Sequence, residues 1–164
     1  MTPFTIPTLS EVLEWSKGKT IINVDKKDVP LPMIAKLLQQ HEAETSVMLT
    51  VHKAEQARFY YAHNPNRMFS AFIRSRQEFD DFENSGIPWS QIMAYVGPVS
   101  KAENKQLYEL LHKRGVMCMI SAAPSYDKLP DPVARQKAYR EIIQAGADVI
   151  ESDLPIEVAN AIAP

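Results

Sequence analysis

The segment IINVDKKD, residues 21–28, joins an apolar run to four charged side chains in a row. The carboxylate of Asp25 and the ammonium of Lys27 are two residues apart, so on an extended chain both point to the same side. Together they could hold a divalent cation and an anionic oxygen, the combination that phosphoryl chemistry needs. A solvated strand end or a local ion pair is the alternative interpretation of the same spacing.

Further polar side chains follow the later apolar runs of the sequence. His52 follows the second run and could act as a general acid or base, or lie at the surface near a helix start. Arg74 and Arg76 follow the third run and could bind phosphate, although RSRQEF also has the pattern of a helix opening. The last run holds Glu151, for which three interpretations stay open: the barrel interior, the barrel mouth, or a pair with a basic group. It also holds Asp153, for which we expect a helix-capping role.

Six short apolar runs predict the strands that position these residues. The runs are rich in Val, Ile and Met and cover residues 20–25, 46–51, 68–73, 92–97, 116–121 and 148–153. Near-continuous apolar character is typical of parallel strands that are buried on both faces. Amphipathic helical patterns fill the gaps, as in residues 31–42, and one more helix is expected before the first strand at residues 9–17.

The five glycines indicate where the helices end. Gly18, Gly86, Gly115 and Gly146 each follow a helical pattern, at the left-handed position that often ends a helix. Gly97 lies at the end of a predicted strand instead. No glycine-rich phosphate loop remains, and neither GxGxxG nor GxxxxGK[ST] is present, so a dinucleotide-binding or P-loop fold is disfavoured.

The predicted architecture is therefore an α/β domain that covers residues 1–164 as a single unit. We expect an incomplete TIM (β/α)8-type barrel of about six parallel βα units, and a six-stranded open sheet is the alternative. A complete eight-stranded barrel usually takes about 250 residues. In both architectures ligands bind at the carboxyl ends of the strands, where the polar residues above collect.

Composition narrows the classes of partner. The chain has 164 residues, 45% of them hydrophobic, with 18 basic and 20 acidic side chains and a net charge of -2. This balance gives no reason to expect nucleic acid or an anionic membrane as partner. No apolar run approaches the roughly 20 residues of a membrane span, and the first residues lack signal-peptide features. We therefore expect a soluble chain, and the sequence does not assign its cellular compartment. Its single cysteine, Cys118, is expected to be a buried thiol.

Three motifs resemble the glycerophosphodiester phosphodiesterase family. IPTLSEVLEW is similar to the family's P-T-L-x-E-x-L helix, IINVDKKD to its strand ending in Glu-x-Lys, and AGADVIESDLP to its G-x-D-x-I-x-[ST]-D-x-P signature. The resemblance implies a (β/α)8 barrel that hydrolyses glycerophosphodiesters to glycerol 3-phosphate and an alcohol. The family uses a divalent metal, often calcium or magnesium, and belongs to lipid metabolism.

The resemblance also implies roles for single residues. Asp25 corresponds to a metal-binding carboxylate where the family usually has Glu, and Lys27 to the lysine that neutralises the phosphate. We name Lys27 as the candidate catalytic residue, and Lys27, His52 and Arg74 as candidate phosphate-binding residues. The family's His-Arg motif, its Glu-x-Asp metal pair and its second catalytic His have no counterpart in this sequence.

Three hypotheses follow, and whether the chain itself is an enzyme stays open. The first is a glycerophosphodiester phosphodiesterase-like barrel segment that is inactive alone, with no metal necessarily bound. The second is a non-catalytic module that binds a phosphate ligand of the glycerophosphodiester type, or that forms a homo-oligomer through its open barrel edges. The third is an unrelated open α/β sheet.

Overall fold

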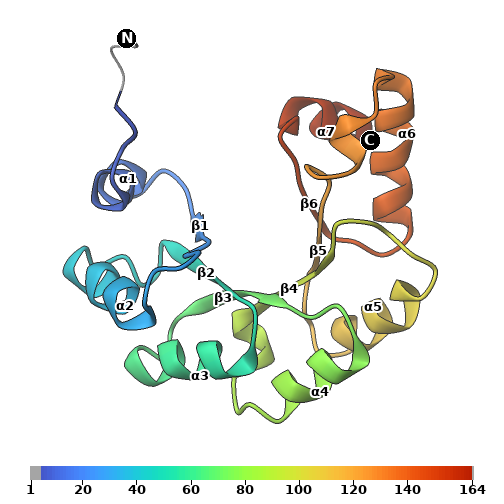
Figure 1. Cartoon of the computed structure of the whole chain (residues 1–164). Coiled ribbons are helices and arrows are strands. Elements are labelled where there is room, and N and C mark those ends of the chain that lie inside the picture. The colour runs from blue at the N-terminus through green and yellow to red at the C-terminus, as the bar shows by residue number, and fades with distance from the viewer. Residues whose placement is uncertain (1–4, 164) are drawn as a thin grey trace.

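The computed structural model describes residues 5–163. Within that range helices and strands alternate along the chain, after a first helix (Figure 1). The strands are β1 (Ile22–Val24), β2 (Val47–Val51), β3 (Met68–Phe72), β4 (Ile92–Gly97), β5 (Cys118–Ser121) and β6 (Val149–Glu151). The α-helices are α1 (Leu9–Ser16), α2 (Leu31–Gln40), α3 (Ala54–His63), α4 (Arg76–Glu83), α5 (Asn104–His112), α6 (Pro132–Gln144) and α7 (Pro155–Ile162).

The six strands form one parallel sheet in the order β1-β2-β3-β4-β5-β6. Figure 1 shows the strands following a curve, with α2, α3, α4 and α5 on its outer side. This arrangement is a curled half-barrel, and it confirms the predicted incomplete TIM-type α/β fold. All strand carboxyl ends therefore meet at one rim of the sheet, called the mouth below.

Strand alternation explains how the core is built. In β3, Phe69 and Ala71 are fully buried, as is Ile73 just after the strand. Phe69 is paired in register with Leu49 of β2 and Ile92 of β4, so apolar side chains from neighbouring strands form a continuous surface under the helices. The alternate residues, such as Ser70, point to the inner side of the curve.

Local signals fix the helix ends. Thr8 and Glu11 form a capping box at the start of α1, with the Thr8 N–H donating to the Glu11 carboxylate at 2.7 Å. The four glycines expected after helices all have positive φ, which confirms that prediction. Gly146 is the most constrained, because its φ is 116° and a Cβ there would lie 3.0 Å from Cδ2 of Tyr108.

Two further expectations concern exposure. Cys118 is a free and fully buried thiol, as the sequence predicted. No helix in residues 5–163 is long and apolar enough to cross a membrane.

Candidate functional site

Asp25 and Lys27 lie at the mouth just after β1. The chain leaves the strand at Val24 and makes a turn in which the Val29 N–H donates to the Lys26 carbonyl at 3.1 Å. Lys27 has a left-handed backbone with φ of 49°, and its ammonium donates a hydrogen bond to Oδ2 of Asp25. The two side chains meet as expected, but the extended-chain geometry predicted for them is wrong, because a turn brings them together.

The pair is ionised and its ammonium remains accessible. The hydrogen bond from Lys27 outweighs the opposing effect of burial and lowers the pKa of Asp25. The same hydrogen bond raises the pKa of Lys27, so both groups keep their charges at neutral pH. The Lys27 side chain is 79% exposed, against 38% for Asp25, so an incoming anion can reach the ammonium.

His52 joins this pair from the end of β2. Its Nε2 lies 3.9 Å from Oδ1 of Asp25, and its ring centroid lies 4.2 Å from that of Phe72. The His52 backbone N–H donates to Oε1 of Gln56 at 2.7 Å, which anchors the residue beside the start of α3. The helix start thus uses the backbone of His52, and its imidazole stays at the mouth next to Asp25.

Arg74, from the end of β3, is held by its own helix. Its Nη2 donates to Oε1 of Glu78 at 2.6 Å, and its guanidinium carbon lies 5.1 Å from the centroid of the Phe72 ring. The hydrogen bond that Arg74 donates to Glu78 raises the pKa of Arg74. Arg74 and His52 nevertheless line one cavity of about 520 Å³, together with Phe72 and Glu78. Two of the predicted phosphate-binding residues therefore face a common space.

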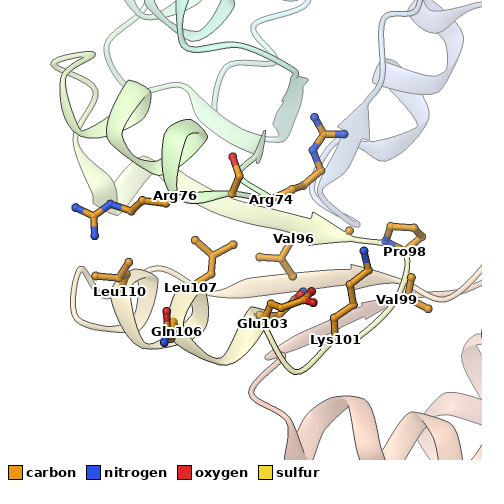
Figure 2. A pocket seen from close by; sticks show the side chains of 13 residues that line it. Arg74, Arg76, Val96, Pro98, Val99, Lys101, Glu103, Gln106, Leu107 and Leu110 are labelled. Carbon is orange, nitrogen blue, oxygen red and sulfur yellow. The ribbon is translucent and has the colours of Figure 1, made fainter.

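Arg76 does not join this group. It begins α4 after the Ser75 cap, and its Nε donates to Oδ1 of Asp80 at 2.9 Å, as the helix-opening interpretation expected. A second cavity has a volume of about 480 Å³. Figure 2 shows Arg74 and Arg76 on different sides of it and Leu107 of α5 facing it. This cavity lies between α4 and α5, apart from the Asp25–His52 group.

Two aromatic side chains at the mouth were missed by sequence reasoning. Phe72 and Tyr95 are paired in register on β3 and β4, and their ring centroids lie 4.4 Å apart. Burial raises the pKa of Tyr95, with a further contribution from the Glu151 charge and an opposing one from Arg74. The Glu151 charge also acts on Lys27, so Glu151 belongs to the same electrostatic neighbourhood. Alternation along β3 and β4 could have placed both rings on the inner face.

The capping role predicted for Asp153 is wrong. The N-cap of α7 is Leu154, without a side-chain cap, and the Asp153 N–H instead donates to Oδ2 of Asp127 at 2.7 Å. Asp127 also accepts from the hydroxyl of Ser152 at 2.8 Å and from the hydroxyl of Tyr139 at 2.8 Å. The carboxylate of Asp127, in the loop after β5, thus fixes the β6 end of the mouth. Sequence reasoning named no residue of that loop and missed this one.

The described residues do not by themselves fit a calcium or magnesium ion at Asp25. Such ions take about six or more oxygen ligands, whereas Asp25 meets two basic side chains and belongs to no group of three potential ligands within residues 5–163. Residues 5–163 do contain one group of three potential metal ligands, formed by His112, Cys118 and Asp148. It lies at the other end of the sheet, and its ligand atoms are within 4.8 Å of one another.

A structural role accounts for that second group. Oδ2 of Asp148 lies 2.9 Å from Nε2 of His112 and accepts from the Cys118 N–H at 2.7 Å. Burial raises the pKa of Cys118 to about 12, which favours the neutral thiol over a metal-binding thiolate. Asp148 therefore ties the end of α5 to the start of β5.

Known structures resemble this chain over nearly its whole length. A glycerophosphoryl diester phosphodiesterase from Parabacteroides distasonis is 54% identical, with a TM-score of 0.95, over 99% of this chain and 57% of its own. A putative glycerophosphodiester phosphodiesterase from Galdieria sulphuraria is 11% identical with a TM-score of 0.72, over 98% of this chain and 65% of its own. The second likeness supports the fold alone. No protein-family model and no curated protein matches the chain.

The Parabacteroides distasonis structure confirms the resemblance to the glycerophosphodiester phosphodiesterase family that the three motifs indicated. The chain spans less than two thirds of the length of either structure.

Proposed function

We propose a function from the premise that this chain resembles a glycerophosphoryl diester phosphodiesterase along nearly its whole length. The mouth binds the phosphate of a glycerophosphodiester-type small molecule, as part of a family whose activity is hydrolysis to glycerol 3-phosphate and an alcohol. The observation that carries the proposal is the meeting of Lys27, Asp25 and His52, from the ends of two neighbouring strands, with the Lys27 ammonium exposed.

Each residue has a proposed part in binding. Lys27 neutralises the phosphate charge, and Asp25 positions the Lys27 ammonium by accepting its hydrogen bond. His52 offers Nε2 to a phosphate oxygen, and Arg74 adds a second cation beside the cavity that both residues line. The face of Phe72 supplies an apolar wall for the carbon skeleton of the ligand.

Asp25 has a second proposed role, as a metal-binding carboxylate of the complete family domain. It would fill that role only together with oxygen ligands beyond those that residues 5–163 bring to it. We therefore derive no step through a metal from this chain.

We further propose that the chain alone does not turn over a substrate. Hydrolysis by acid–base catalysis needs one group to activate water and another to protonate the leaving alcohol. Among residues 5–163, His52 is the single imidazole near Asp25. The other three lie elsewhere, His41 with Glu14, His63 with the Phe59 carbonyl and His112 with Asp148. Glycerol 3-phosphate released in an Asp25-dependent and metal-dependent manner would contradict this proposal.

The binding proposal is tested with glycerol 3-phosphate and isothermal titration calorimetry. Lys27→Met should raise the Kd by about 10-fold or more, because one hydrogen bond to a charged group is lost. Lys26→Met is the matched control, since it removes the same charge one residue away, and it should change the Kd by less than about twofold. Equal losses in both variants would show non-specific attraction and would refute the site.

A second candidate function, self-assembly, is favoured by the sheet edges. β1 and β6 each pair with one neighbour in the described sheet, which leaves one side of each strand open. Open edges can pair with another chain. Analytical ultracentrifugation tests this candidate, because a chain that stays monomeric at high concentration excludes edge-driven assembly. The glycerol 3-phosphate titration tests the binding proposal independently of this result.

A further inference from the structure

A second cluster of polar side chains surrounds a cavity at the end of the half-barrel opposite the mouth. The cavity has a volume of about 350 Å³ and lies between α2, the end of α3 and the segment before β3. Small-molecule sites start at about this size. Its polar lining consists of Lys36, Gln39, Glu44, His63, Asn64 and Arg67.

Arg67 is the unusual member of this lining. Its side chain is 2% exposed, and its Nε and Nη1 atoms are buried without a hydrogen-bond partner. The hydroxyl of nearby Tyr60, which is 1% exposed, also lacks a partner. Buried polar groups in proteins are almost always paired, and an unpaired buried charge is strongly unfavourable. The guanidinium therefore calls for an anion.

The fold explains why Arg67 is buried here. The Arg67 N–H donates to the Asn64 carbonyl at 3.3 Å, and this turn leads the chain from α3 into β3. Arg67 is two residues before Phe69, so it shares the strand face that packs against the helices. The guanidinium thus enters the layer between sheet and helices, where water cannot solvate it freely.

Glu44 does not supply the missing partner. It lines the same cavity, and its charge raises the pKa of Arg67 against the larger effect of burial, but neither Nε nor Nη1 of Arg67 has a hydrogen-bond partner, Glu44 included. Lys36 adds a second cation, so the lining carries two positive charges against one negative charge. Oδ1 of Asn64 accepts from the Asn66 N–H at 2.8 Å, which leaves the Asn64 amide NH2 as a donor.

We propose that this cavity binds the phosphate group of a small anion. Arg67 is the central binding residue and Lys36 is the second cation. The planar guanidinium donates two parallel hydrogen bonds to phosphate oxygens. A doubly charged phosphate matches the two cations, and the amide donor of Asn64 takes a further oxygen. The site lies at the strand amino ends, so it is distinct from the mouth and does not depend on the function proposed there.

The test uses inorganic phosphate and follows the Nε–H resonance of Arg67 by nuclear magnetic resonance. At constant ionic strength, phosphate should shift this resonance in a saturable manner, whereas chloride should not. Lys36→Met should raise the Kd for phosphate by about 10-fold. Lys27→Met, the control at the mouth, should leave this titration unchanged. A resonance that does not respond to phosphate, or a response lost in Lys27→Met and kept in Lys36→Met, overturns the proposal.

Two more variants separate an anion site from an internal ion pair. Glu44→Gln should strengthen phosphate binding about threefold or more, because a repulsive carboxylate leaves the cavity. Arg67→Met removes the reporter resonance, so this variant is followed by its unfolding temperature, which should rise in phosphate-free buffer because an unpaired buried charge is removed. If Glu44→Gln instead lowers both phosphate affinity and unfolding temperature, Arg67 is paired with Glu44 and the proposal fails. This Glu44 result also decides the case should Arg67→Met not fold.

Discussion

The carboxylate of Asp127 offers a sharp test of how the mouth is held together. It accepts three hydrogen bonds, from the hydroxyls of Tyr139 and Ser152 and from the Asp153 N–H, each at 2.7 or 2.8 Å. Hydrogen bonds to a charged group contribute about 1.5–3 kcal/mol each. The full sum of three such contributions is not expected, because Asp127 is half-buried and because contributions within one hydrogen-bond network are not additive. We expect Asp127→Ala to lower the free energy of unfolding by about 3–5 kcal/mol.

Two further variants isolate the chemistry of this network. Asp127→Asn should cost only about 1 kcal/mol, because the amide oxygen still accepts from two donors and its NH2 can donate to the Tyr139 hydroxyl. Tyr139→Phe should cost about 1.5–2 kcal/mol in the native background and almost nothing beside Asp127→Ala. Urea unfolding followed by circular dichroism measures each value. A loss below about 1 kcal/mol for Asp127→Ala, or a Tyr139→Phe cost that is equal in both backgrounds, would refute the reasoning.

Three other predictions follow from local geometry. Gly146→Ala should destabilise the fold by about 1–3 kcal/mol in urea unfolding, because the backbone is left-handed and the new Cβ meets Tyr108; Gly18→Ala, with open space around it, should cost less. The Cys118 thiol should not react with a disulfide reagent in the native chain but should react fully in urea, and rapid native labelling would contradict its burial. Burial acts to raise the pKa of Glu78, but the hydrogen bonds from Arg74 outweigh it and hold the folded pKa below the ordinary 4.5. This ion pair therefore stabilises the chain above about pH 4.5, and its contribution is lost as the pH falls. Between about pH 6 and pH 3, the free energy of unfolding should decrease more in the wild type than in Glu78→Gln. Equal decreases would argue against the pair.

The fold was predictable because apolar runs and helix-ending glycines agree with each other. Both ends of every strand lie within two residues of the predicted run. β1 and β6 are shorter than predicted, at three residues each, because each is an edge strand with a ladder on one side only. Sequence patterns report apolar character, and they do not report how many neighbours a strand has.

The candidate site was predictable only in part. The contact between Asp25 and His52 agrees with the rule that strand carboxyl ends meet at one rim, although no such pair was predicted. The same reasoning could not foresee that Arg74 pairs with Glu78, because that contact depends on how α4 leaves the sheet. Asp127 was missed because its partners lie 12 to 26 residues away and share no motif with it. Whether these residues bind phosphate stays a prediction.

The left-handed turn at Lys27 implies a conflict between folding and recognition. At a φ of 49°, glycine would have a lower backbone conformational energy than any branched or long side chain, and asparagine would be the next most favourable residue. A chain optimised only for resistance to denaturation would therefore give up the ammonium at this position. Keeping it fixes a charge at the rim at the expense of a strained backbone, a pattern that is common where a protein must meet a ligand.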